Sequence, residues 1–456
     1  MNYSEPEIKF IDTTVRDGNQ CLWDATGITT AMILSIAPVM DRIGFKAVDF
    51  IAGMHMAVSV RWHKENPWEK IRLVCQAMPR TPLSFGTTGR RFMGWRVVPE
   101  SVIALALKLV IANGIRRIWV LDASHNVDFI QRQARLAKAA GAEEVVVALS
   151  YTISPVHTDE YYAQKAREIA ASPDVDGVYI KDQGGLLTVD RIRTLVPATL
   201  KSIDGLPLEI HSHCNTGLAP LVYLEAIQLG VQTVHTAISP LANDTSQPST
   251  ENTLRNVRHL GYSANLDEEA LEAMAAHFRY VAEREGRPLG APVEHDVYYY
   301  EHQVPGGMMT ILKRQLSEIK MEHRLDEVLE EVVKVRKELG YPIMVTPFSQ
   351  FVGSQATMNV ISGERYKTVP TQVIEYVAGY YGEPPALIDE NILDKISSLP
   401  QAKNILDAEP REPSIEELRR KIGSGLSDEE FLIRLALPDK EVEDMLAAGP
   451  IKTEYR

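Results

Sequence analysis

One pattern constrains the fold of this 456-residue chain more than any other: a short apolar run, then a polar turn, then an amphipathic stretch of helical length. It recurs up to about residue 240. Strands that alternate with helices in this way form parallel sheets, because each helix carries the chain back to the start of the next strand. The eight runs that we predict as strands span residues 8–13, 47–51, 82–86, 117–122, 144–150, 177–182, 207–213 and 233–238.

Eight strands within this length match an α/β fold, the (β/α)₈ or TIM barrel. A six-stranded doubly wound sheet would leave two runs unplaced, and the turn after the first run, TTVRDGNQ, lacks the glycine-rich phosphate signature of that fold. We therefore predict a barrel domain over residues 1–265. Residues 266–456 are predicted to form a helical accessory domain and tail, with helices over 267–285 and over the highly charged segment 316–340.

Charge and cysteine content exclude several classes of protein. The chain has 48 Lys and Arg against 61 Asp and Glu, a net charge of −13, which argues against nucleic-acid binding because phosphates attract a basic surface. Three cysteines, an odd number, are typical of a reducing compartment. No apolar stretch reaches the ~20 residues that span a bilayer. We expect a cytoplasmic protein without membrane insertion.

Polar side chains follow the ends of the predicted strands, where the active sites of such barrels lie. They are Asp12, Arg16, Asp122, Lys181, Asp182, His211, His213 and Thr245. His211 and His213 are two residues apart, so both point to one face of their strand and can reach one ion. A lysine such as Lys181 can pair with a carboxylate, act as a desolvated amine or Schiff base, or carry CO₂ as a carbamate, and its position alone does not choose among these.

Eight segments carry a resemblance to a known family. They are FIDTTVRDGNQ (10–20), SYT (150–152), YIKDQGGLL (179–187), EIHSHCNTG (209–217), DTSQPS (244–249), YYEHQVPGGM (299–308), VTPFSQFVGSQA (345–356) and VIEYVAGYYGEPP (373–385). In this order they resemble the carboxyltransferase domain of pyruvate carboxylase, the alpha subunit of oxaloacetate decarboxylase and the 5S subunit of transcarboxylase. The resemblance covers nearly the whole chain and implies a biotin-dependent carboxyltransferase on a barrel similar to that of the DRE-TIM metallolyases.

The resemblance implies a metal centre. A divalent ion, zinc, manganese or cobalt, would be held by Asp12, His211, His213 and a carbamylated Lys181. Two neutral imidazoles and two oxygen donors suit such an ion. Carbamylation would turn the lysine from a cation into an anion, which favours metal binding.

The resemblance also implies roles around this centre. Thr245 would shuttle a proton between biotin and the enolised acceptor, while Arg16 and Gln20 would contact the substrate. Arg16 precedes Asp17, so a simple ion pair at the barrel rim is the alternative for this arginine.

Biotin is expected on a separate carrier. No biotin-acceptor tetrapeptide of the Met-Lys-Met type occurs, and the nearest string, Ile319-Lys320-Met321, lies within the helix predicted over 316–340. We therefore expect a biotin carboxyl carrier protein and a separate biotin carboxylase subunit as partners. The resemblance further implies a homodimer.

The segment expected to bind the acceptor departs from the family pattern. Members that act on pyruvate have an LLRGAN-type stretch after the third strand, whose arginine binds the substrate carboxylate. This chain reads SFGTTGRRFMGW (84–95), with Thr88 in the place of that arginine and Arg90 and Arg91 further along the loop. The WGGATFD-type stretch after the second strand is replaced by FIAGMHMAV (50–58). We predict that the reaction is retained and that the acceptor differs from pyruvate.

Two other functions stay open at this point. One is a metal-dependent aldolase or Claisen-type lyase of the hydroxymethylglutaryl lyase or isopropylmalate synthase group, which also has a DTTVRDG-like segment and a His-x-His on the seventh strand. Lys181 and the C-terminal segments favour carboxyl transfer over this alternative. The other is a non-catalytic assembly subunit. The departure from the family pattern at Thr88 favours this alternative, and the retained site residues argue against it.

Overall fold

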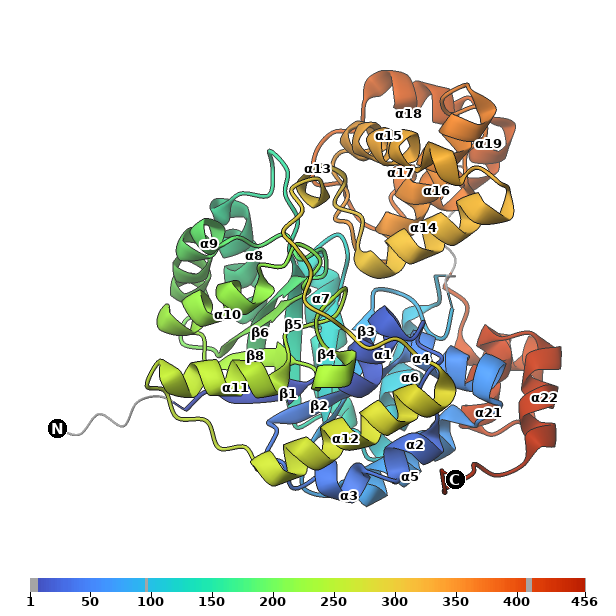
Figure 1. The fold of residues 1–456 in the computed structure, drawn as a ribbon. Coiled ribbons are helices and arrows are strands. Elements are labelled where there is room, and N and C mark those ends of the chain that lie inside the picture. The colour runs from blue at the N-terminus through green and yellow to red at the C-terminus, as the bar shows by residue number, and fades with distance from the viewer. Residues whose placement is uncertain (1–6, 95–96, 407–411, 456) are drawn as a thin grey trace.

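The computed structural model describes residues 7–94, 97–406 and 412–455; Trp95, which ends the 84–95 stretch, and residues 407–411 lie outside these ranges. Within them, eight parallel strands form a closed barrel in chain order, with β1 paired to β8 (Figure 1). The strands are β1 (Lys9–Asp12), β2 (Ala47–Ala52), β3 (Leu83–Thr88), β4 (Arg117–Leu121), β5 (Glu144–Ser150), β6 (Gly177–Asp182), β7 (Leu208–Ser212) and β8 (Thr233–Thr236). Each lies where the sequence predicts a strand, so the (β/α)₈ fold is confirmed.

Helices and short helical turns connect the strands and cover the barrel. They are η1 (Thr14–Gly18), α1 (Asn19–Leu22), α2 (Thr30–Leu34), α3 (Ala37–Met40), α4 (Gly53–Val58), η2 (Ser59–His63), α5 (Pro67–Ala77), α6 (Glu100–Ala112), α7 (Val127–Ala140), α8 (Asp159–Ala170), α9 (Val189–Ser202), α10 (Ala219–Gln228), η3 (Ser239–Leu241) and α11 (Thr250–His259). Asn66, Asn126, Thr158 and Thr188 cap α5, α7, α8 and α9 by accepting hydrogen bonds from first-turn backbone N–H groups. The polar turns of the sequence therefore fix where these helices begin.

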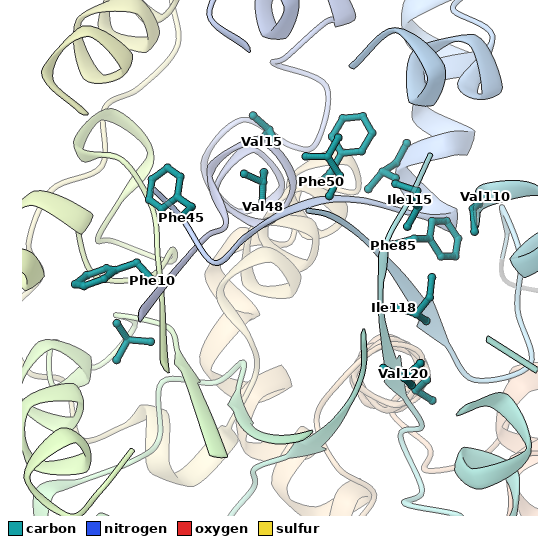
Figure 2. Close-up of a cluster of buried hydrophobic side chains, with 14 of the residues drawn as sticks. Phe10, Val15, Phe45, Val48, Phe50, Phe85, Val110, Ile115, Ile118 and Val120 are labelled. Carbon is teal, nitrogen blue, oxygen red and sulfur yellow. The ribbon is translucent and has the colours of Figure 1, made fainter. Parts of the chain in front are cut away.

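The strands of the barrel bury both of their faces. Outward residues such as Phe10, Val48 and Phe50 pack against the covering helices, on the convex side of the strands (Figure 2). Inward residues such as Trp119 and Tyr179 belong to a second apolar cluster, which continues into the C-terminal helices. Alternate residues of a strand point to opposite faces, so only the inward set can meet across the barrel.

The described residues after β8 and α11 form helices and loops, as predicted. The helices are α12 (Glu268–Glu285), α13 (Tyr299–His302), α14 (Gly306–Glu318), η4 (Glu322–Arg324), α15 (Leu325–Glu338), α16 (Phe348–Ser362), α17 (Thr371–Val377), α18 (Glu390–Ser397), α19 (Pro400–Leu406), α20 (Ile415–Ile422), α21 (Asp428–Ala436) and α22 (Asp439–Ala448). None of the described helices combines the length and apolarity needed to cross a membrane.

These C-terminal helices lie in two places. Helices α14 to α19 form a unit beyond one end of the barrel, whereas α12 lies along the barrel and α21 and α22 lie beside it (Figure 1). Phe431 of α21 and Val442 of α22 are fully buried in the same apolar cluster as the outer barrel residues. The division at residues 265 and 266 stays a prediction, and the end of the predicted tail packs on the barrel.

The predicted continuous helix over 316–340 is wrong. Helix α14 ends at Glu318, and Lys320 has a left-handed backbone with φ of +58°. The N–H of Met321 donates to the carbonyl of Leu316 at 2.8 Å, which closes the helix in a Schellman-type turn. Leu316 is buried and Met321 partly buried in one cluster, so the turn buries both. The Ile319-Lys320-Met321 string therefore lies in a turn between helices.

A large buried side chain lies inside the barrel. The indole of Trp119 on β4 lies over Gly86 of β3, where an added Cβ would be 1.9 Å from the ring. The indole N–H donates to Oδ1 of Asp49 at 2.9 Å. Gly86 is therefore needed for space, and the ring that it admits holds an inward carboxylate of β2 in place.

We predict that Gly86→Ala destabilises the fold, because the new methyl group would overlap the ring of Trp119. The free energy of unfolding, measured by chemical denaturation, should fall by about 1–3 kcal/mol. Gly353→Ala is the control: its Cβ would meet open space inside α16, so stability should hold or rise by up to about 1 kcal/mol. Equal stability of Gly86→Ala and wild type would contradict this packing.

Candidate metal centre and active site

Four buried side chains converge at the mouth of the barrel. Oδ2 of Asp17, on η1, lies 3.1 Å from Nε2 of His211 and 3.3 Å from Nε2 of His213, and the two imidazole nitrogens are 3.1 Å apart. Lys181 is paired with His211 in the β6–β7 ladder. Its Nζ lies 3.1 Å from Nε2 of His211 and 3.8 Å from Oδ2 of Asp17. Segments far apart in the chain thus place their donor atoms around one point.

The predicted place of Asp12 in this cluster is wrong. On β1, Asp12 shares a face with Phe10, which packs in the outer core, and so it points away from the histidines. Its carboxylate accepts a hydrogen bond from Oγ1 of Thr14 at 2.5 Å, and burial raises its pKa to about 7. The chain then turns through η1, which brings Asp17 over the barrel mouth instead.

The spacing of the clustered atoms suits a divalent metal ion. Neighbouring ligands with metal bonds of about 2.1 Å lie about 3.0 Å apart in an octahedral site and about 3.4 Å apart in a tetrahedral one. The separations of 3.1–3.3 Å between Asp17 and the two imidazoles fall in this interval. One carboxylate oxygen and two imidazole nitrogens beside an amine also suit the implied zinc, manganese or cobalt ion.

Both imidazoles present Nε2 to the cluster because Nδ1 is engaged elsewhere. Nδ1 of His213 lies 2.6 Å from the carbonyl oxygen of Thr245, which can only accept, so this nitrogen carries the proton. Nδ1 of His211 lies 3.2 Å from Nδ1 of His235 on β8. The lone pair of Nε2 in His213 therefore faces the other donors.

Gln247 is a member of this site that the sequence analysis did not single out. Its amide oxygen accepts from Oγ1 of Thr13 at 2.7 Å, and its amide nitrogen donates to Oδ2 of Asp17 at 3.0 Å. The amide thus orients the clustered carboxylate. The available signal was its place in the DTSQPS segment just after the eighth strand.

Opposite charges surround the clustered carboxylate. Nη1 of Arg16 lies 3.1 Å from Oδ1 of Asp17, and its Nε donates to Asp49 at 2.7 Å. Burial alone would raise the pKa of Asp17, but Arg16 and Lys181 hold it well below its ordinary value. Burial lowers the pKa of Lys181, although Asp17 acts in the opposite direction. The donors of Arg16 are thus directed to two aspartates.

Other predicted site residues lie around this centre. Gln20 is exposed on α1. The hydroxyl of Thr245 donates to the carbonyl of Cys21 at 3.1 Å. The start of α14 lies directly against Thr245, because a Cβ on Gly306 would be 2.3 Å from its Cγ2. The helical unit therefore closes over this threonine.

Thr88, Arg90 and Arg91 line a cavity of about 180 Å³ at the ends of β3 and β4, bounded on the other side by the loop after α17. Arg90 pairs with Glu412. Arg91 is only 9% exposed, its guanidinium lies 5.5 Å from the ring centroid of Tyr381, and its Nε has no hydrogen-bond partner among the described residues. Burial lowers the pKa of Arg91 to about 10.

Known proteins are similar to this chain in sequence. Residues 299–447 match the conserved carboxylase domain family. The chain is 38% identical over 391 residues to a pyruvate carboxylase subunit of Methanocaldococcus jannaschii, covering 85% of this chain and 68% of that protein. It is 31% identical over 440 residues to the 2-oxoglutarate carboxylase large subunit of Hydrogenobacter thermophilus, covering 95% and 67%. The chain belongs to the carboxyltransferase family of biotin-dependent carboxylases.

The fold of this carboxyltransferase is also that of a solved relative. The carboxyltransferase domain of Rhizobium etli pyruvate carboxylase superposes with a TM-score of 0.88 at 24% identity, over 97% of this chain and 78% of that one. The predicted family and the predicted enzyme class, a biotin-dependent carboxyltransferase, are confirmed. Carboxyl transfer, rather than aldol or Claisen cleavage or assembly without catalysis, is therefore the function class of the chain.

We predict that Asp17 and Asp12 differ in their effect on metal binding. Asp17→Ala removes a donor atom from the cluster and should weaken cobalt affinity by more than about 100-fold, as measured by competition with a chelator. Asp12→Asn keeps the shape of a side chain that faces the outer core. The cobalt affinity of this variant should match that of the wild type. The opposite ranking would return the ligand role to Asp12.

Proposed function

We propose that this carboxyltransferase moves a carboxyl group between carboxylated biotin on a separate carrier and the enol form of a 2-oxo acid. The observation that carries the proposal is the buried convergence of Asp17, Lys181, His211 and His213 beside Thr245. These four residues would hold a divalent metal, which would supply Lewis acidity for the negative charge that develops on the carbonyl oxygen of the acceptor.

Lys181 is proposed to act as a carbamate. Its neutral Nζ attacks CO₂, an N–C bond forms, and one N–H proton leaves to solvent, so the side chain becomes an anion. Two features support this role: the amine is buried, which disfavours its cationic form, and it lies beside the three other donors. A carbamate oxygen reaches further than Nζ and suits the same ion.

Thr245 is proposed to move the proton. As the acceptor carbon loses a proton to form the enolate, the threonine hydroxyl takes that proton and passes its own to the biotin nitrogen that has lost the carboxyl group. The enolate carbon then forms the new bond to the released CO₂. The position of Thr245 between His213 and the start of α14 supports this role, because it lies at the mouth where a carrier-borne group enters.

Arg91 is proposed to bind the carboxylate of the acceptor. It shares its cavity with Arg90 and Arg132, but Glu412 pairs with Arg90 and Glu100 with Arg132. No ion pair within 4.0 Å joins Arg91 to a described residue, and a buried guanidinium of this kind favours an incoming anion. Pyruvate and 2-oxoglutarate, named in the two relatives, are both 2-oxo acids with such a carboxylate.

The partners follow from the same family membership. We propose a biotin carboxyl carrier protein that delivers the biotin and a biotin carboxylase subunit that carboxylates it, with the assembly acting in the cytoplasm. The two relatives are each named as one subunit of a carboxylase, which supports a multi-subunit enzyme. The homodimer stays a prediction.

We predict that Thr245→Ala lowers carboxyl transfer by about 10²–10⁴-fold, because the proton relay is lost. The measurement is biotin-dependent decarboxylation of oxaloacetate and of oxalosuccinate, the carboxylated forms of pyruvate and 2-oxoglutarate. Thr245→Ser keeps the hydroxyl and should keep most of the rate. Turnover of either acid at the same rate without biotin would defeat the proposed function.

Arg91 and Arg90 form a matched pair for the acceptor site. Arg91→Gln should raise KM for the preferred 2-oxo acid by about 10–100-fold, the loss expected for one charge-assisted hydrogen bond, with a smaller change in kcat. Arg90→Gln removes an arginine whose partner is Glu412 and should leave KM near the wild-type value. A larger effect for Arg90 than for Arg91 would reassign the carboxylate site.

A further inference from the structure

A chain of buried polar side chains runs from the clustered donors into the barrel interior. Nδ1 of His211 lies 3.2 Å from Nδ1 of His235, and Nε2 of His235 lies 2.9 Å from Oε2 of Glu209. His235 is 4% exposed, His211 1% and Glu209 0%. Glu209 and His211 alternate with Ile210 on β7, so both face inward. None of these contacts is needed to bring Asp17 and His213 to the centre.

The carboxylate of Glu209, at the far end of this chain of side chains, fixes the direction of the hydrogen bonds. An ionised carboxylate can only accept, so Nε2 of His235 carries the proton that it donates to Glu209. A neutral imidazole has one N–H, which leaves Nδ1 of His235 as an acceptor. Nδ1 of His211 must then donate to it, and Nε2 of His211 keeps a free lone pair toward the clustered donors.

Glu209 is held in place by two cations. Its Oε1 accepts from Nζ of Lys46 at 2.6 Å, and its Oε2 accepts from Nη2 of Arg117 at 2.7 Å. Both cations also contact Glu144. Nε of Arg117 lies 2.6 Å from its carboxylate, and Nζ of Lys46 lies 2.9 Å from it. The carboxylate therefore stays ionised and fixed in place. A hydrogen-bond acceptor needs both properties to set the tautomer of an imidazole.

We propose that His235, supported by Glu209, is a positioning residue that holds His211 in its Nδ1–H form and so aims Nε2 at the divalent metal. The inference rests on the metal centre of the proposed function and deepens it. The hydrogen bond also donates electron density to His211, which strengthens the imidazole as a ligand. His213 uses a backbone carbonyl for the same purpose, so the two imidazoles are oriented by independent devices.

Two other interpretations of His235 are weaker. As an additional metal ligand it would have to direct a nitrogen at the clustered donors, but its Nδ1 faces Nδ1 of His211 and its Nε2 faces Glu209. As a packing residue it would need no defined tautomer and would not influence metal affinity. The second interpretation makes a different prediction and can be tested.

The test compares cobalt binding to the full chain in four proteins: wild type, His235→Phe, His235→Asn and His125→Phe. His125 is the matched control, because it is also fully buried but accepts a hydrogen bond from the backbone N–H of Ser150, apart from the clustered donors. Affinity is measured by chelator competition and the fold by chemical denaturation. In wild type without metal, nitrogen NMR of labelled histidines reads the tautomers of His211 and His235.

We expect the dissociation constant for cobalt to rise by about 10–100-fold in His235→Phe, the usual loss for a residue that orients a ligand. His235→Asn places an amide oxygen near the position of Nδ1 and should recover part of the affinity. His125→Phe should bind cobalt as wild type does, whatever its stability. The NMR spectrum should show Nδ1–H for His211 and Nε2–H for His235.

Wild-type affinity in folded His235→Phe, or Nδ1–H in His235, would overturn the inference. If His235→Phe does not fold, His235→Asn and the tautomers of the wild type decide. Failure of the wild type itself to bind cobalt would instead defeat the metal centre of the proposed function, so the two failures are distinguishable.

Discussion

The register between β6 and β7 is the constraint on which the active site depends. It pairs Lys181 with His211, and the inward alternation of both strands turns these side chains to the same interior. A shift of either strand by one residue would send its side chain to the helix-covered face and separate the pair. Because the barrel is closed, that register is coupled to every other strand pair around the ring, and no local adjustment near the site can change it alone.

The interior of this barrel contains several buried charged side chains. Buried charges are costly unless each has a partner, and here they are joined in sets, such as Arg16 with Asp17 and Asp49, and Arg117 with Glu209. The outward faces of the strands pack with the helices in an extensive apolar cluster (Figure 2). The outward residues of the strands thus stabilise the barrel, and the inward residues can provide donor atoms.

The C-terminal helices complete the site and also extend it. The start of α14 lies against Thr245, and the loop after α17 closes the cavity that Arg91 lines. Loops at the carboxyl ends of barrel strands are where catalytic groups gather, and this unit covers those loops. Acceptor and carrier would therefore meet at a boundary between barrel and helices.

The amino-acid sequence by itself determined where the eight strands lie and the candidates Lys181, His211 and His213, because strand ends in a (β/α)₈ barrel all reach one mouth. It also carried the segments that mark the family. Only the tertiary structure decided that Asp17 rather than Asp12 joins the histidines. Asp12 ends β1 and Asp17 lies further along the chain in η1, and the sequence does not show which of the two carboxylates turns toward the histidines. The contact of His235 with His211 was also hidden, because it forms only where β7 and β8 lie side by side in the closed barrel.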